Sequence, residues 1–224
     1  MGRAERPSGL KRDRALLFAC IAAALAAPAI AFADPLSDPA VRTRGSGAQT
    51  IIGAPRASAC ANAAMAGRAD AGVIADCDEG LRSETLDRKQ ATFTHLNRGA
   101  VHLRMGNAEA ALKDFDEAVK MTPKNANALI NRGAALVMLK RNGEAVATLT
   151  RALQLKPATP ETAYYYRATA REALNDVRGA YEDYNTALLI KPGWAMVAAD
   201  MARFARIRRD QLATTLGETP RGAP

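Results

Sequence analysis

The residues best suited to chemistry in this chain of 224 residues are cysteines and histidines. Cys60 and Cys77 are the right type of pair to form a disulfide bond in an oxidising compartment. His95 and His102 lie seven residues apart, which places both on one face of a helix and would suit two metal ligands.

Catalysis requires a convergent set of activated groups, and no such set is found in the sequence. It has no Gly-rich phosphate loop, no nucleophile elbow and no cysteine cluster with metal-site spacing. Asp114, Asp116 and Glu117 form a local acidic group, but on a helix such residues are ordinary surface or ion-pair residues. We therefore expect a protein that is not an enzyme, with no cofactor and no small-molecule substrate.

Residues 1–33 have the layout of a secretory signal peptide. A basic stretch ends at Arg14, and an apolar run then closes with Ala31-Phe32-Ala33, the small-x-small pattern that signal peptidase requires. We predict cleavage after Ala33 and a periplasmic or secreted mature protein. The alternative is that residues 15–33, close to the ~20 apolar residues of a membrane span, remain as an inner-membrane anchor with the domain outside the cytoplasm.

The net charge of +8 does not predict a nucleic-acid partner. Five basic residues against two acidic ones place +3 of that charge in the leader. The remaining excess is typical of a soluble protein with weak, non-specific affinity for polyanions.

Helical patterning dominates the chain after residues 34–56, which are rich in Pro, Gly and Ser and predict a flexible linker. No segment alternates polar and apolar residues for long enough to form a strand, so we predict an all-α fold. Pro123, Pro157 and Pro192 end similar segments, 34 and 35 residues apart. The tripeptide at residues 97–99 recurs at 131–133 and, more loosely, at 166–168.

This pattern resembles the tetratricopeptide repeat (TPR), which has a small residue midway along its first helix, Ala and a large apolar residue in its second, and Pro after it. The resemblance covers residues 92–192 and implies a TPR-type helical-hairpin solenoid. Its three repeats are expected at residues 92–125, 126–159 and 160–193. The expected packing residues, with Gly99 and Ala111 facing each other inside the first hairpin, are Gly99, Ala111, Phe115, Ala118, Gly133, Ala145, Ala152, Ala180, Tyr184 and Ala187.

Elements of the same kind flank the repeats. Residues 57–91 predict a degenerate N-terminal hairpin, and residues 194–214 predict a C-terminal capping helix followed by a disordered tail at 215–224. The capping helix has an apolar face of Val197, Met201 and Phe204. Its arginines are expected to face mostly solvent: Arg203, Arg206, Arg208 and Arg209.

The N-terminal hairpin suggests a pairing for its two cysteines. Cys60 and Cys77 lie at equal distances from the turn, which would place them at the same height in an antiparallel hairpin. We predict a disulfide bond; the alternative is two buried thiols in a cytosolic protein. The resemblance places His95 and His102 at aromatic positions of the repeat, so we expect them to be packing residues and expect no metal site.

A recurring arginine occupies a hairpin-facing position in each repeat, and a buried charge there needs a partner. Sixteen residues after each arginine stand Asp114, Thr148 and Asp183. We predict ion pairs Arg98–Asp114 and Arg167–Asp183, with Arg132 bonding a backbone carbonyl or solvent. The alternative is three exposed stems lying over apolar surface.

The first helices of this family line a concave groove that binds proteins. By position, the groove residues are Phe93, Leu96, Ala100, Leu103, Arg104, Asn127, Ile130, Ala134, Val137, Met138, Thr162, Tyr165, Thr169 and Glu172. This surface is mainly apolar, so we expect an exported adaptor that binds a peptide or protein segment there. The alternative is a structural or self-associating scaffold, such as a homodimer, with no free groove.

Overall fold

The computed structural model describes residues 54–216, and within that range every regular element is a helix. The described residues belong to one compact unit. The predicted signal peptide and most of the predicted linker lie outside them. Within residues 54–216 no helix is both long and apolar enough to span a bilayer. The helices are α2 (Pro55–Met65), α3 (Ala71–Ser83), α4 (Arg88–Arg104), α5 (Ala108–Met121), α6 (Ala126–Met138), α7 (Asn142–Gln154), α8 (Pro160–Ala173), α9 (Val177–Ile190) and α10 (Ala195–Thr215).

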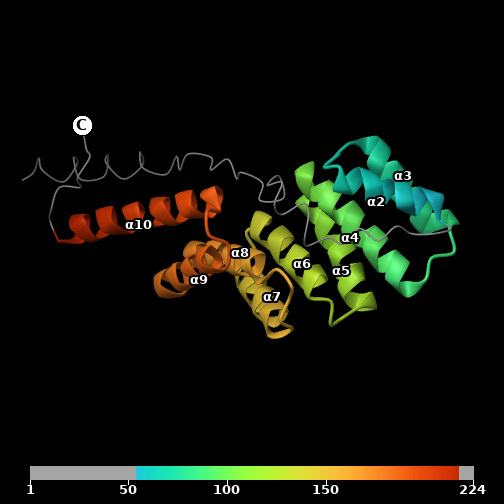
Figure 1. Ribbon diagram of the computed structural model, residues 1–224. Helices are drawn as coiled ribbons and strands as arrows, with labels where there is room; N and C mark the ends of the chain where they lie inside the picture. The colour runs from blue at the N-terminus through green and yellow to red at the C-terminus, as the bar shows by residue number, and fades with distance from the viewer. Residues whose placement is uncertain (1–53, 217–224) are drawn as a thin grey trace, which may run out of the picture. The chain divides into compact units, whose positions relative to one another are not determined.

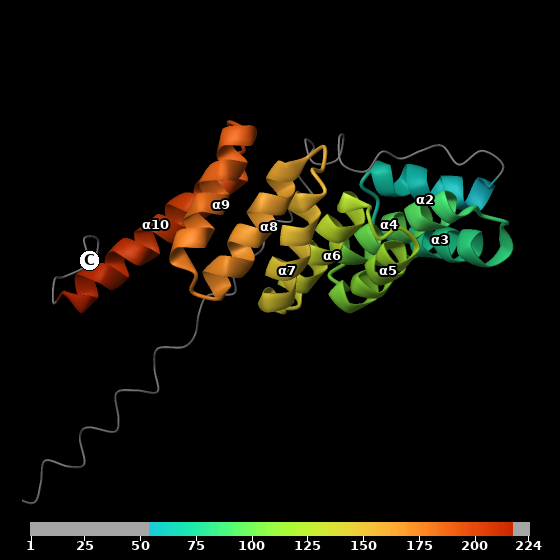
Figure 2. The same cartoon turned by 90° about the horizontal axis from the view of Figure 1, so that it is seen from below.

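Consecutive helices pair into four hairpins, and each hairpin packs against the next. Figures 1 and 2 show the hairpins α2–α3, α4–α5, α6–α7 and α8–α9 following one another in chain order. The second helix of each hairpin contacts the first helix of the next, and the first helices α4, α6 and α8 also contact one another in turn. The predicted all-α hairpin solenoid is therefore confirmed for the described part of the chain.

All four hairpins turn by the same backbone device. The second residue after the first helix has a positive φ in each: Gly67, Gly106, Lys140 and Asn175. The amide group of this residue and that of the next one donate to carbonyls of the helix just ended. Lys140 N–H donates to the Val137 carbonyl, and Arg141 N–H donates to the Leu136 carbonyl. This helix C-cap satisfies carbonyls that would otherwise lack partners. The N-terminal hairpin therefore has the same turn as the regular repeats.

Small residues allow the two helices of a hairpin to approach closely. A Cβ atom at Gly99 would lie 2.5 Å from the Phe115 ring, and one at Gly133 would lie 2.5 Å from Leu149. Gly99 therefore makes room for the Phe115 ring. The predicted packing side chains are all fully buried: Ala111, Phe115, Ala118, Ala145, Ala152, Ala180, Tyr184 and Ala187.

Candidate functional site

The predicted groove residues differ widely in exposure. Six of the apolar ones belong to the main hydrophobic core, where they are buried: Leu96, Leu103, Ile130, Ala134, Val137 and Tyr165. Others are half-buried: Phe93, Ala100, Arg104, Asn127, Thr162, Thr169 and Glu172. Met138, at the end of α6, is 38% exposed. Fewer groove residues are therefore accessible than predicted, because much of their apolar area is buried in the packing between hairpins.

Arg104, the basic residue of the predicted groove, contacts the N-terminal hairpin. Its Nη2 donates to the carbonyl of Ala64, in the last turn of α2, at 3.0 Å. A cation at a helix C-terminus is favourable because the carbonyls there carry partial negative charge. The Arg104 guanidinium therefore joins α4 to α2.

Two predicted groove residues of the third repeat, Tyr165 and Glu172, form hydrogen bonds with α10. Glu172 accepts hydrogen bonds from Tyr184 Oη at 2.8 Å and from Arg203 Nη1 at 2.8 Å. Tyr165 Oη donates to Asp200 at 3.0 Å. The prediction that Arg203 faces solvent was wrong, because Glu172 is within its reach. The apolar face of α10 also packs there, with Val197 and Phe204 buried.

Aromatic rings join α8, α9 and α10 at the same place. The Tyr165 ring lies 5.5 Å from Trp194 and 6.2 Å from Tyr184 between centroids. Burial, aided by the carboxylates of Asp200 and Glu172, raises the pKa of Tyr165 and that of Tyr184. Both hydroxyl groups therefore stay protonated at neutral pH and act as hydrogen-bond donors.

The recurring arginines reach the second helix of their own hairpin. Arg98 Nε lies 2.9 Å from Asp114 Oδ2, and Arg167 Nε lies 2.8 Å from Asp183 Oδ2. Both pairs are bidentate, with a second bond from Nη2 to Oδ1. The structure therefore brings together both pairs named from the sequence.

Each arginine also bonds the second helix of the preceding hairpin. Arg132 donates to Thr148 Oγ1 at 2.7 Å and to Asp116 Oδ1 at 2.6 Å, so the expectation of a backbone carbonyl or solvent was wrong. Arg98 reaches back to Asp78 and Arg167 to Thr150 in the same way. Sequence reasoning missed these second partners. The available signal was that acceptors stand two residues apart in the second helices, at Asp114 and Asp116 and again at Thr148 and Thr150.

Asp114 is the most buried carboxylate of the first repeat, with 3% exposure. His95 Nδ1 lies 2.9 Å from its Oδ1 atom, so His95 contacts a carboxylate rather than only packing. Burial alone would raise the pKa of Asp114, but the hydrogen bonds to His95 and Arg98 outweigh burial and hold that pKa below its ordinary value. Asp114 therefore remains a carboxylate in the folded protein.

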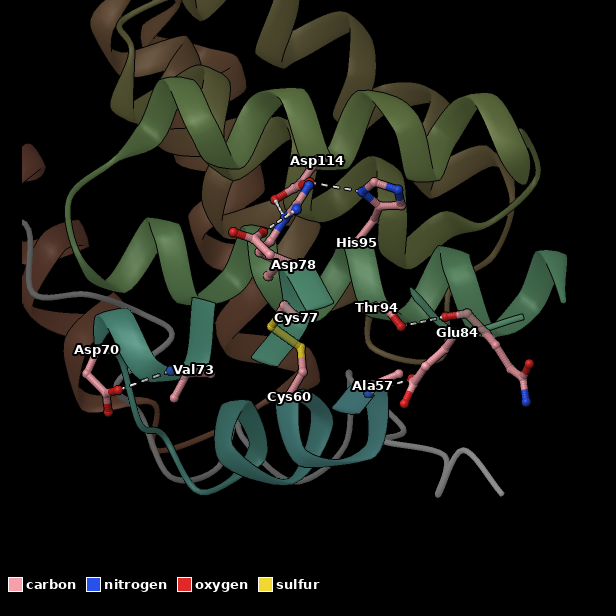
Figure 3. The surroundings of a disulfide bond; sticks show 12 residues. Ala57, Cys60, Asp70, Val73, Cys77, Asp78, Glu84, Thr94, His95 and Asp114 are labelled. Atoms are coloured by element: carbon pink, nitrogen blue, oxygen red, sulfur yellow. Dashed lines mark hydrogen bonds and ion pairs between the residues drawn. A yellow bond between two sulfur atoms is a disulfide. The ribbon is translucent and has the colours of Figure 1, made fainter. Parts of the chain in front are cut away.

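Cys60 and Cys77 meet across the N-terminal hairpin, as Figure 3 shows. Their sulfur atoms lie 2.07 Å apart and their Cα atoms 4.9 Å apart, which is disulfide geometry. Both residues are fully buried and pack with Val101 of α4. The pair therefore lies where α2 and α3 contact α4 of the first repeat.

No group of three or more metal-ligating side chains occurs within residues 54–216. His95 bonds Asp114, and His102 is half-buried on the same helix. Asp114 is thus a hydrogen-bond partner of His95, seven residues before His102 on α4.

Comparison with known proteins finds a family match over the first two predicted repeats. A family model described as "Tetratricopeptide repeat" matches residues 96–160. Rat serine/threonine-protein phosphatase 5 is 31% identical over 122 residues, which cover 52% of this chain and 24% of the phosphatase. The rat mitochondrial import receptor subunit TOM70 is 31% identical over 131 residues, or 54% of this chain and 21% of the receptor. The chain therefore spans less than a quarter of the length of these curated relatives.

Solved structures share the fold. The TPR domain of Arabidopsis OM64 is 25% identical, with a TM-score of 0.51, and covers 54% of this chain and 98% of its own. MamA from Desulfovibrio magneticus RS-1 is 19% identical with a TM-score of 0.57, over 72% of this chain and 90% of its own. The first TPR of Spaghetti, bound to the HSP90 peptide SRMEEVD, is 21% identical with a TM-score of 0.50. The match covers 57% of this chain and 99% of the Spaghetti chain.

Proposed function

Since the chain is a tetratricopeptide repeat protein, we propose that it is a non-enzymatic adaptor that binds a peptide or protein segment on its first helices. The observation that carries this proposal is the exposure of Met138, on α6, the first helix of the second repeat. Half-buried Phe93 of α4 and Asn127 of α6 add to the accessible surface among the predicted groove positions. The peptide complex of Spaghetti supports the proposal in one respect, because a domain of this fold binds a peptide.

The proposed partner presents apolar side chains rather than a C-terminal carboxylate. A carboxylate needs a cation aimed into the groove, and Arg104 instead donates to the Ala64 carbonyl. Glu172 would repel an acidic end, and it already bonds Arg203 and Tyr184. A flexible, polarizable Met138 side chain suits an apolar segment of variable shape.

We place the adaptor outside the cytoplasm. Support comes from the signal-like residues 1–33, with their Ala31-Phe32-Ala33 site, and from the geometry of Cys60 and Cys77. Disulfides persist in oxidising compartments and are rare in the cytosol. The proposal therefore includes an oxidised Cys60–Cys77 pair in the exported protein.

Site-specific photo-crosslinking in cells tests the binding surface. A photo-reactive amino acid at Met138 should capture a defined protein, whereas the same group at Lys113, exposed on the second helix α5, should not. Met138→Glu should then reduce co-purification of the captured protein. Equal capture from both positions, or none from Met138, would contradict the proposed surface.

A further inference from the structure

The last described helix, α10, is built as the first helix of another hairpin. It starts three residues after Pro192, as α6 starts three residues after Pro123. This register makes Ala198, Ala202 and Ala205 the equivalents of Leu129, Gly133 and Leu136 in α6.

The face of α6 that carries these residues is covered by its own second helix, α7. Leu129 is 2% and Leu136 0% exposed, and Gly133 lies directly under Leu149. On α10 the equivalent residues Ala198, Ala202 and Ala205 are all exposed. No second helix follows α10 within residues 54–216, so a face that binds an antiparallel helix elsewhere in this chain is uncovered here.

The same face continues along α10 as a regular seam. We define the α10 seam as Ala198, Ala202, Ala205, Arg209, Leu212 and Leu216. Its spacing alternates four and three residues, the pattern of a coiled-coil contact. All six residues are exposed, with Leu212 at 64% and Leu216 at 72%. Val197 and Phe204, which pack on the rest of the molecule, lie on another side of α10.

The α10 seam is complementary to itself when inverted. An antiparallel pairing centred on Ile207 places Ala198 opposite Leu216, Ala202 opposite Leu212, and Ala205 opposite Arg209. Large side chains of one helix thus meet small residues of the other, which is how Leu149 meets Gly133 inside the second repeat. A two-fold contact requires one patch to fit itself in this way.

Charges beside the α10 seam favour the same arrangement. Arg206 is exposed on one side of the seam, and Asp210 lies on that side one turn further along. Inversion about Ile207 brings Asp210 of one copy to within about 3 Å, along the helix axis, of the level of Arg206 in the other. Asp210 Oδ1 is buried with no hydrogen-bond partner, and its nearest cation is Arg209, 3.6 Å away.

From these observations we infer that two copies of this protein associate through α10, each α10 serving as the missing second helix of the other. The contact is antiparallel, because α6 and α7 are antiparallel and because the sizes and charges match only in that direction. This inference goes beyond the proposed adaptor role and does not depend on it, because α10 is distinct from Met138 of α6.

Sedimentation of the purified full chain over a concentration series tests the inference. The protein should show a reversible monomer–dimer equilibrium. Leu212→Glu and Ala202→Glu should each raise the dimer dissociation constant about tenfold or more, because they place charge in an apolar contact. Thr214→Glu changes an exposed residue on the side of α10 opposite the seam, and it should have little effect. Circular dichroism would establish that each variant keeps its helices.

Charge reversal separates this contact from other partners. Arg206→Asp and Asp210→Arg should each weaken the dimer, and the double variant should restore it, because the reversed pair again attracts across the two-fold axis. A monomer at every concentration would overturn the inference. A dimer whose dissociation constant is unchanged by Leu212→Glu would also overturn it, as would a double variant that dimerises no more tightly than the single variants. If α10 instead binds a different protein, the purified chain should be a monomer at every concentration.

Discussion

At the scale of single residues, the strongest prediction concerns Asp114. Asp114→Asn should lower the free energy of unfolding by about 3 kcal/mol, because it removes one partner of a buried ion pair and leaves Arg98 partly uncompensated. Asp116 is the matched control, since it pairs with Arg132 through a carboxylate whose side chain is 48% exposed. Asp116→Asn should cost about 1 kcal/mol or less. Urea unfolding at neutral pH measures both, and equal costs would refute the distinction.

The same carboxyl group also makes the contribution of this pair depend on pH. The pKa of Asp114 is lower in the folded protein than its ordinary value, so the folded state binds fewer protons than the unfolded state. The contribution of the Asp114 carboxylate to the free energy of unfolding should be fully present above about pH 4, the pKa of this group in the unfolded state. It should decline as the pH falls through the pKa of the group in the folded state. The difference in unfolding free energy between wild type and Asp114→Asn should therefore shrink between pH 5 and strongly acidic pH. A difference that grew on acidification would contradict this.

Glycine packing supplies a second prediction at residue scale. Gly133→Ala should destabilise by about 1–3 kcal/mol, because the added Cβ would overlap Leu149 inside a packed core. Gly143→Ala is the control, since a Cβ there meets nothing within 4 Å in helix α7. That change should stabilise by up to about 1 kcal/mol, through helix propensity. Thermal unfolding compares the two, and similar effects would show that close approach at Gly133 is unimportant.

At the scale of elements, the prediction concerns the α2–α3 hairpin and the bond between its cysteines. Replacing Cys60 and Cys77 by Ser should lower stability by about 3 kcal/mol in the chain-entropy account of closing a 17-residue separation. Hydrogen exchange should speed up mainly in α2 and α3, while α6 and α7 keep their protection. Mass measurement of non-reduced, exported protein should find both thiols blocked. Free thiols in that sample would end the disulfide proposal.

At the scale of the whole molecule, the prediction concerns where the protein works. Residues 1–40 fused to a reporter that is active only outside the cytoplasm should give activity, because a basic stretch precedes an apolar run with a cleavage pattern. The mature protein should begin at Asp34. Replacing Ala33 with a bulky residue is the control and should block processing. A product that keeps Met1 and stays with membranes would instead support an anchor at residues 15–33.

The sequence by itself determined the repeat architecture. A close-packed hairpin requires particular residues at particular positions of its own sequence. The prolines 34 and 35 residues apart and the small residues Gly99 and Gly133 meet these requirements, so the sequence alone identifies the hairpins. The pairs Arg98–Asp114 and Arg167–Asp183 could be named for the same reason. Within one hairpin, sequence distance translates directly into height along the partner helix.

Only the tertiary structure decided which faces remain accessible. Arg104 bonds Ala64, 40 residues earlier, and Glu172 bonds Arg203, 31 residues later. Such contacts depend on how whole hairpins lie against one another, and long side chains can reach several acceptors at similar cost. Periodicity assigns a side chain to a face of its helix, but the neighbouring hairpin determines what that face meets.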